Sequence, residues 1–349
     1  MHYLVTGGAG FIGSNIVEKL ILKGEKVRIL DSFFSGKREN LLFPEHERIE
    51  VIEGDIRNLK DCRQAASGID YVLHHAAIAS VPHSVKDPLL THEVNVTGTI
   101  NMLIAARDAR VRRFVLASSS SVYGNGNCMR EPNREEMRTE PLSPYALSKW
   151  IGEETCKIFT RLYGLETVAL RYFNVFGIRQ NPRSEYAAVI PKFIEAVLQK
   201  RRPLIYGDGL QSRDFVYVDD VVEANLKACM TPNSVAGKVF NVACGKSCTL
   251  LDILDSLSQI NEMAIEPVHT SSKAGDIRHS LADISLSKSL LGFEPGTPFY
   301  EGLKKTTEWY RAGLRAQQEC ETICSILKLR SETDAFPDPL QDSKLIENT

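Results

Sequence analysis

The chain has 349 residues, of which 43% are hydrophobic, so it can bury a full core and is expected to form a large α/β domain plus a smaller one. Its formal net charge of −2 gives no sign of nucleic-acid binding. No apolar run reaches the roughly 18 residues of a membrane span. The first predicted strand starts within a few residues of Met1, which leaves no room for a signal peptide. We therefore expect a cytoplasmic protein without nucleic-acid or membrane partners.

The first predicted elements are a strand at residues 3–5, a glycine turn at 6–13 (TGGAGFIG) and a helix at 14–23. Residues 26–31 form the next strand, which ends at Asp31. In this order, Gly7, Gly10 and Gly13 let a pyrophosphate approach the backbone at the start of a helix. An acidic residue at Asp31 would hold the adenosine ribose hydroxyls and repel a 2′-phosphate. The pattern favours NAD over NADP, although Lys37 and Arg38 follow closely and leave that preference open.

Strands and helices continue to alternate, which predicts a doubly wound parallel sheet. We expect strands at 49–56, 71–77, 113–118 and 167–174, and helices at 95–109 and 144–163. Ligands of such sheets bind at the carboxyl ends of the strands. The candidate residues at those ends are Gly7, Asp31, Asp55, Ala76, Ser119 and Asn174.

The helix predicted at 144–163 carries Tyr145 and Lys149, which lie four residues apart and therefore share a helix face. A neighbouring cation favours a phenolate and would lower the pKa of Tyr145. A phenolate that takes and returns a hydroxyl proton is what reversible alcohol oxidation requires. The serine run 118–121 precedes this helix and supplies further hydrogen-bonding groups.

Eight cysteines are scattered along the chain, and the two C-x3-C pairs lack partners at metal-site spacing. We expect reduced thiols and no metal. The cysteines are Cys62, Cys128, Cys156, Cys229, Cys244, Cys248, Cys320 and Cys324.

These motifs together resemble the extended short-chain dehydrogenases/reductases, and more closely the nucleotide-sugar 4-epimerases that act on UDP-galactose and UDP-N-acetylglucosamine. The likeness runs from about residue 2 to about 310. It is carried by TGGAGFIG, Asp31, Asp55-Ile56, HHAA (74–77), SSSSVYG (118–124), SPYALSK (143–149) and RYFNVFG (171–177), and later by VIPKF (189–193), IYGDGLQSRDFVYVDDVV (205–222), FNVACGKS (240–247) and AGDIRHSLADIS (274–285). The resemblance implies a Rossmann-type NAD-binding domain at 1–175, and a mainly sugar-binding domain at 176–310 with some segments returning to the main sheet. Residues 311–349 form an extension beyond the family pattern.

The resemblance also implies roles for individual residues. Tyr145 would deprotonate the sugar 4-hydroxyl while the C4 hydride passes to NAD. Lys149 would hold the nicotinamide ribose, and Ser119 would bond the reacting oxygen. The implied cofactor contacts are Gly7, Gly10, Phe11, Ile12, Gly13, Asp31, Gly36, Asp55, Ile56, Ala76, Ala77, Asn95, Ser118, Tyr145, Lys149, Tyr172 and Phe173. The implied substrate contacts are Ser80, Ser119, Ser120, Ser121, Tyr145, Asn174, Val189, Lys192, Tyr206, Arg213, Asn241, Arg278 and Ser280.

Some of these residues have simpler interpretations. A serine of the run can cap a strand end, Lys192 can be solvated on a helix, and Tyr206 can pack without binding substrate. The pair Asp219-Asp220 is read from the resemblance as a helix start, where negative charge is favourable, so no metal is assigned to it.

Three positions bear on the substrate and the reaction. Ser280 matches the family position beside the sugar 2-substituent, where a small residue admits an N-acetyl group. This favours UDP-N-acetylglucosamine/UDP-N-acetylgalactosamine interconversion, with the non-acetylated pair as a further substrate. Ser120 and Ser121 replace the acidic residues of the related dehydratases and decarboxylases, which disfavours those reactions. A UDP-glucuronate 4-epimerase and a non-catalytic NAD-binding scaffold remain as alternatives.

After residue 310 we expect a helix over 311–330 and, from Ser331, a polar tail with Pro337 and Pro339 that is mobile or binds a partner. The resemblance implies a homodimer formed through the helices near 98–110 and 146–163.

Overall fold

The computed structural model describes residues 1–125, 131–182, 188–272 and 278–333. The chain divides into two units, residues 1–306 and 307–349, and each is described by itself. The predicted Cys128, the start of the segment 274–285 and most of the tail lie outside the described residues.

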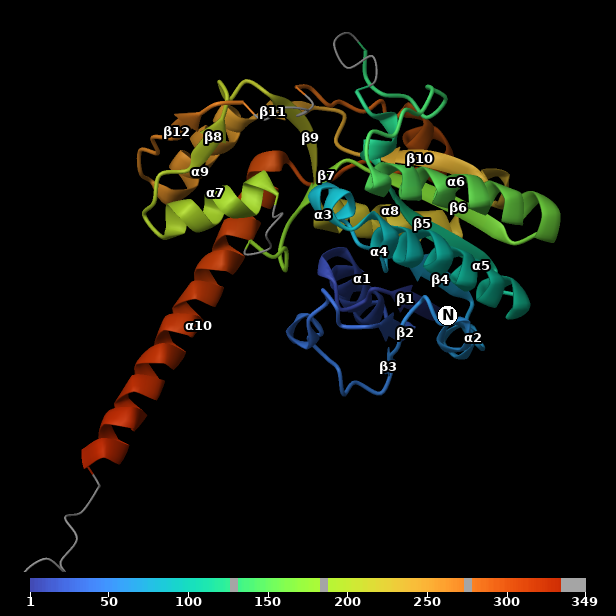
Figure 1. Ribbon diagram of the computed structural model, residues 1–349, viewed down its shortest axis with the longest axis horizontal. Helices are drawn as coiled ribbons and strands as arrows, with labels where there is room; N and C mark the ends of the chain where they lie inside the picture. Colours follow the sequence, from blue (N-terminus) through green and yellow to red (C-terminus); the bar gives the residue numbers. More distant parts are fainter. Residues whose placement is uncertain (126–130, 183–187, 273–277, 334–349) are drawn as a thin grey trace, which may run out of the picture. The chain divides into compact units, whose positions relative to one another are not determined.

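The first unit is built on a seven-stranded sheet in which every pairing is parallel, in the order β3-β2-β1-β4-β5-β6-β10 (Figure 1). The order reverses between β1 and β4, which is the crevice where such sheets bind ligands. The predicted doubly wound fold is confirmed. The strands are β1 (His2–Thr6), β2 (Lys26–Asp31), β3 (Ile49–Glu53), β4 (Tyr71–His74), β5 (Arg113–Ser119), β6 (Glu166–Tyr172) and β10 (Lys238–Val242).

Alternate residues of the strands point to opposite faces, so each face of the sheet builds its own core. Val5, Leu73 and Val115 belong to a core with helices α1 (Phe11–Leu22) and α8 (Val218–Met230). Leu4 and Phe114 belong to the opposite core with α2 (Leu59–Ala66), α5 (Gly98–Asp108) and α6 (Pro144–Tyr163). Both faces are thus covered by helices, as a parallel sheet requires.

Helix α6 begins and ends at clear sequence signals. Ser143 caps its start by accepting a hydrogen bond from Ala146 N, and Pro144 occupies the first turn, where its missing N–H costs nothing. Gly164 ends it with φ +69°, a left-handed conformation that glycine adopts without strain. The prediction of a helix over 144–163 is confirmed.

Smaller sheets lie beyond the carboxyl end of β6. One has the order β11-β9-β7, from β11 (Ser247–Thr249), β9 (Ser212–Tyr217) and β7 (Asn174–Phe176), and the other pairs β12 (Val268–Thr270) with β8 (Leu204–Tyr206). A single residue, Phe173, separates β6 of the large sheet from β7 of the small one. The remaining elements are α3 (Val81–Lys86), α4 (Pro88–His92), α7 (Val189–Leu198), α9 (Leu250–Asn261), α10 (Phe299–Thr333), and the short helical turns η1 (Arg38–Asn40), η2 (Glu93–Thr97), η3 (Ser120–Tyr123), η4 (Asn233–Val235) and η5 (Ser287–Leu291).

Two predicted strands end earlier than expected because side chains capture the backbone at their carboxyl ends. The strand predicted at 49–56 stops at Glu53, and Asp55 N then donates to Asp61 Oδ2 at 3.0 Å. The strand predicted at 71–77 stops at His74, and Ala76 N donates to Thr6 Oγ1 at 3.1 Å. Both turns free the chain to line the ligand edge of the sheet.

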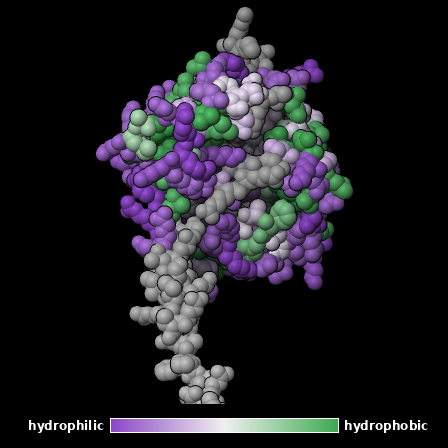
Figure 2. Space-filling view, turned by 60° about the vertical axis from the view of Figure 1, so that its left-hand side comes forward, coloured by the Kyte–Doolittle hydropathy of each residue, from purple (hydrophilic) through white to green (hydrophobic). Residues whose placement is uncertain are grey.

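The helix expected over 311–330 is present, because α10 continues to Thr333. Among the described residues, none of the helices has the length and apolar character needed to cross a membrane. The face seen in Figure 2 is largely hydrophilic, with hydrophobic side chains scattered over it.

Candidate active site

The glycine turn after β1 packs closely against the ends of the neighbouring strands β2 and β4. Gly7 has φ +68°, and its N–H donates to Leu30 O at 2.8 Å. A Cβ at Gly7 would lie 2.7 Å from Ala76 N, and one at Gly13 would lie 2.1 Å from Gly7 O, so neither position admits a side chain. A Cβ at Gly10 would meet Gly7 O at 3.1 Å and no other described atom within 4 Å, so a ligand can approach there. Because α1 has no side-chain cap, its first N–H groups can bind a pyrophosphate.

Asp31 lies at the end of β2 and is 7% exposed. Its carboxylate accepts hydrogen bonds from Ala9 N and Phe33 N, both at 2.9 Å, and so holds the glycine turn in place. Gly36 packs against the same carboxylate, where a Cβ would come within 2.9 Å of both oxygens. Each carboxylate oxygen has a second lone pair, so Asp31 can still accept bonds from ribose hydroxyls.

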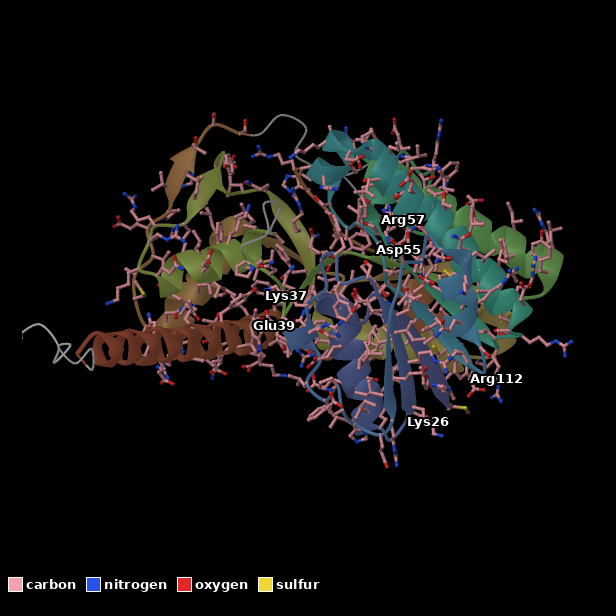
Figure 3. The ribbon with its side chains drawn as sticks, turned by 60° about the horizontal axis from the view of Figure 1, so that its bottom comes forward. Lys26, Lys37, Glu39, Asp55, Arg57 and Arg112 are labelled. Carbon is pink, nitrogen blue, oxygen red and sulfur yellow. The ribbon has the colours of Figure 1, made fainter. Side chains whose placement is uncertain are left out.

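The basic residues after Asp31 are neutralised by acidic neighbours. Lys37 Nζ lies 2.9 Å from Glu39 Oε1, and Arg38 forms an ion pair with Glu53. Figure 3 shows Lys37 beside Glu39. These pairings weaken the case for a 2′-phosphate partner that the sequence left open.

Asp55 follows β3 and pairs with Arg57 at 2.6 Å (Figure 3). The Arg57 hydrogen bonds hold the pKa of Asp55 below its usual range, so the carboxylate stays ionised. Ile56 is buried, and Gly98 packs so closely that a Cβ there would lie 2.6 Å from Ile56 Cδ1.

The catalytic candidates meet at the carboxyl end of β5. Lys149 lies on the buried face of α6, and its ammonium donates to Ala117 O at 2.8 Å. The same ammonium nitrogen lies 5.9 Å from the centre of the Tyr145 ring. Ser119 hydrogen-bonds the Tyr145 phenol, an interaction that lowers the pKa of Tyr145. Tyr145, Lys149 and Ser119 therefore lie together, as the motif predicts.

The pKa of Tyr145 itself departs from the expectation that Lys149 lowers it. Burial raises this pKa, and the hydrogen bond from Ser119 opposes the rise. Burial also lowers the pKa of Lys149 to about 8. The reason is that both groups lose water, which destabilises each charged form.

The serines of the run play different structural parts. Ser118 Oγ donates to Glu153 Oε1 at 2.5 Å, so its hydroxyl is engaged away from a cofactor. Ser119 caps the turn η3 by accepting from Ser121 N at 3.2 Å, and Ser121 Oγ donates to Ser119 Oγ at 2.9 Å. Ser120 and Ser121 are half-buried beside this turn. Ser119 thus caps η3 and can still bind the reacting oxygen of the substrate.

Asn95 lies in the turn η2 and ties two site segments together. Its side chain accepts from Ile78 N at 2.8 Å and donates to Ser148 Oγ at 3.0 Å, and Ser148 Oγ donates to Tyr145 O at 2.7 Å. The loop with Ala76 and Ala77 is thereby fixed against α6. Asn95 braces the site in this structure, while its contact with cofactor stays a prediction.

Tyr172 and Phe173 lie at the carboxyl end of β6. The Tyr172 hydroxyl lies 3.0 Å from His75 Nε2 and receives a bond from Asn225 Nδ2 at 2.8 Å. The Phe173 side chain is 1% exposed and packs against Tyr123, so only its backbone could meet a ligand.

The substrate candidates of the second half gather around β9. Arg213 Nη1 donates to Arg278 O at 3.2 Å, and Ser280 N donates to Ser212 O at 3.0 Å, which places Ser280 next to the strand that carries Arg213. Asn174 Nδ2 donates to Asp214 O at 3.1 Å. The Arg278 guanidinium pairs with Asp208 at 2.7 Å.

The other substrate candidates differ in accessibility. Lys192 and Tyr206 are exposed, and Val189 is half-buried at the start of α7. Ser80 caps α3 by accepting from His83 N at 3.1 Å, which is a structural role for its hydroxyl.

Asn241 lies in the protein interior, and its contact with substrate stays a prediction. It is fully buried (0% exposed), and its side-chain amide donates to Asn133 O at 2.9 Å and to Asp283 O at 3.0 Å. Its side-chain oxygen accepts from Tyr123 OH at 2.7 Å. These interior hydrogen bonds of Asn241 join segments that are distant in the sequence.

Several residues of the site neighbourhood were missed by motif reasoning. The buried Asp214 carboxylate binds Cys244 N at 2.8 Å and Gly245 N at 2.9 Å and so anchors β9 to the loop after β10; nothing in its local sequence signals this. Glu153 follows Lys149 by four residues, and this spacing could have indicated that Glu153 shares the helix face of the site. The predicted helix start at Asp219-Asp220 is confirmed, since both lie in the first turn of α8.

Within the described residues, His, Cys, Asp and Glu form no group of three that could hold a metal ion. Free thiols are present at Cys62, Cys156, Cys229, Cys244 and Cys248.

The glycine turn against the uncapped helix α1 lies at the switch of strand order between β1 and β4, and the Tyr145/Lys149 pair lies at the carboxyl end of β5. This arrangement is typical of dinucleotide-dependent enzymes. The family model "NAD dependent epimerase/dehydratase family" matches residues 3–243, and the chain belongs to this family of extended short-chain dehydrogenases/reductases. Its cofactor is NAD, which the glycine turn and Asp31 fit.

Relatives named as UDP-sugar 4-epimerases match most of the chain. A UDP-N-acetylglucosamine 4-epimerase from Methanobrevibacter ruminantium, solved with UDP-N-acetylmuramic acid, is 43% identical with a TM-score of 0.85, covering 89% of this chain and 98% of that one. A putative UDP-glucose 4-epimerase of Methanocaldococcus jannaschii is 39% identical over 88% of this chain and 98% of its own length. A UDP-glucuronic acid 4-epimerase from Bacillus cereus, solved with UDP-glucuronic acid and NAD, is 31% identical with a TM-score of 0.81, covering 88% of this chain and 98% of that one.

Proposed function

We propose that the chain is a UDP-sugar 4-epimerase that inverts C4 through a transient 4-keto sugar, with UDP-N-acetylglucosamine and UDP-N-acetylgalactosamine as its main pair. The observation that carries the proposal is the meeting of Tyr145, Ser119 and Lys149 at the ligand edge of the sheet. Ser120 and Ser121 stand where elimination or decarboxylation would need acidic groups. The similarity to sugar-nucleotide 4-epimerases supports the same reaction.

In this reaction Tyr145 takes the proton of the 4-hydroxyl and later returns it to the same oxygen. Ser119 holds that oxygen and stabilises the phenolate through its hydrogen bond. Lys149, anchored at Ala117 O, positions the nicotinamide ribose and supplies positive charge. Bound NAD provides the reversible acceptor for the C4 hydride. Arg213 and Arg278 hold the diphosphate while the keto sugar presents its other face.

The substrate preference rests on Ser280. Its small side chain is half-buried beside β9, next to the strand that carries Arg213. A serine there leaves room for an acetamido group, whereas a large aromatic residue would fill that room. Ser280→Tyr should therefore lose activity on the acetylated pair and keep or gain activity on UDP-glucose. Unchanged turnover of the acetylated sugar would refute the role of Ser280.

The proposal is tested by incubating purified protein separately with UDP-N-acetylglucosamine, UDP-glucose and UDP-glucuronate and resolving the products. We expect the acetylated sugar to epimerise fastest, without added NAD if the cofactor stays bound. Exclusive turnover of UDP-glucuronate would replace the substrate assignment. Bound NAD with no turnover of any sugar would point to a non-catalytic scaffold.

A further inference from the structure

One face of α6 carries Tyr145, which is half-buried, and the buried Lys149 and Glu153 at intervals of four residues. The first two belong to the proposed chemistry, and Glu153 has no part in it. Glu153 is fully buried, at 0% exposure. A carboxylate in the interior is costly unless it is paired and hydrogen-bonded, so its presence beside the catalytic pair needs a reason.

The Glu153 carboxylate joins three elements of the site. Arg171 binds it with both sides of its guanidinium, Nε to Oε1 at 2.9 Å and Nη2 to Oε2 at 2.7 Å. Ser118 Oγ donates to Oε1 at 2.5 Å. Ser118 immediately precedes Ser119 at the end of β5, and Arg171 immediately precedes Tyr172 at the end of β6. The Glu153 side chain thus fixes the ends of β5 and β6, which carry Ser119 and Tyr172.

We propose that Glu153 is a positioning residue for the reaction: it locks Ser119 against Tyr145 through Ser118 and Arg171, and its negative charge supports the ammonium form of Lys149. The inference rests on the proposed function and adds to it a residue that does not touch the substrate.

The electrostatics around Lys149 agree with this geometry. Burial lowers the pKa of Lys149 to about 8, and the charge of Glu153 opposes that shift. His74 at the end of β4 and His75 directly after it face the same ammonium, and burial keeps both neutral, with pKa values of about 3 and about 4. Glu153 is therefore the anion that acts on Lys149. Arg171 pairs with the Glu153 charge. Among the described residues, Cys156 on α6 also feels the Glu153 charge, while Tyr123 and Glu135 interact with Arg171.

A purely architectural role for the ion pair makes a different prediction. If Glu153 only stabilises the fold, replacing both charges by apolar side chains of similar size should leave chemistry intact, because such replacements are often tolerated. If the charge of Glu153 matters, the pH dependence of kcat must shift even in a variant that folds well.

The first test is Glu153→Gln, which keeps the shape and removes the charge. We expect kcat at neutral pH to fall about tenfold with little change in KM, and the alkaline limb of the kcat profile to move about one unit lower, because Lys149 loses its proton more easily. Glu154→Gln is the matched control, since Glu154 is half-buried and pairs with Lys157 on the outer side of the helix. The control should behave as the wild type.

Because Glu153→Gln leaves the Arg171 guanidinium without its anion, a second variant removes both charges, Glu153→Leu with Arg171→Met. We expect it to fold, as judged by a cooperative urea transition, to bind NAD, and still to show the shifted alkaline limb. Wild-type kcat and pH profile in this double variant would overturn the proposal.

A direct titration separates this inference from the proposed function. In protein with isotope-labelled lysine, the Lys149 resonance is assigned with Lys149→Arg and followed against pH by NMR. We expect its pKa to drop by about one unit in the double variant. An unmoved Lys149 pKa would refute the role of Glu153 even if the enzyme is an epimerase. A wild-type protein inactive on every UDP-sugar would instead refute the proposed function and leave the titration to decide on Glu153.

Discussion

Gly13 is a position in the glycine turn where a single added carbon should be strongly damaging. A Cβ there would lie 2.1 Å from Gly7 O and 2.9 Å from Gly8 Cα, far inside the 3.4 Å at which ordinary contact begins. Helix α1 and the glycine turn would have to separate by about 1 Å, which costs roughly 2–3 kcal/mol of unfolding free energy as overpacking. The gain from replacing a helical glycine by alanine, about 1 kcal/mol, offsets only part of this. Gly13→Ala should also bind NAD about a hundredfold more weakly, ~2.7 kcal/mol, because the turn that cradles the pyrophosphate is displaced.

The assay is urea unfolding with and without NAD, together with calorimetric NAD titration. Gly313→Ala is the control, since Gly313 lies in α10 and a Cβ there would meet nothing within 4 Å. This control should be as stable as the wild type or more so, with unchanged NAD affinity. If Gly13→Ala matched the wild type in both stability and NAD binding, the close-contact argument would be wrong.

Three further predictions follow from the same structure. Ser119→Ala removes the hydrogen bond that lowers the pKa of Tyr145, so the acid limb of the kcat profile should move to higher pH. At pH 7, kcat should fall by about 10²-fold. An unmoved acid limb would contradict the effect of this hydrogen bond on Tyr145. Burial lowers the pKa of His75 to about 4, so its contribution to stability is present above pH 6.5 and is lost as pH falls toward 4, by up to about 3 kcal/mol. His75→Gln should remove this part of the pH dependence in urea unfolding and leave the part due to His74. Leu162 is 64% exposed on α6, so Leu162→Asp should give monomers in light scattering, whereas the 71% exposed Leu22→Asp on α1 should leave the expected dimer intact.

The sequence was informative wherever the signal is local. Apolar alternation and the glycine turn predicted the strand–helix order, and the four-residue spacing placed Tyr145 and Lys149 on one face of α6. Ser143 and Gly164 mark the ends of that helix in the sequence as they do in the structure. These features depend on neighbours within a few residues, so one chain suffices to find them.

Features that depend on distant partners could not be found in this way. Asn241 carries an amide that suits a ligand, yet it binds Asn133, Tyr123 and Asp283, all far away in the sequence. The raised pKa of Tyr145 likewise reflects burial by the whole site, which spacing alone does not reveal. The roles of the other cofactor and substrate residues stay predictions.

Phe173 links two sheets with no spare residue between them. Tyr172 pairs with Ser119 in the large sheet, and Asn174 pairs with Phe215 in the small one. Inserting one residue here would slip the register of a strand and exchange its inward and outward side chains. Natural length variation should therefore be absent at this junction and concentrate in surface connections such as residues 41–48. A library of single-residue insertions selected for folding would recover almost none between positions 172 and 174.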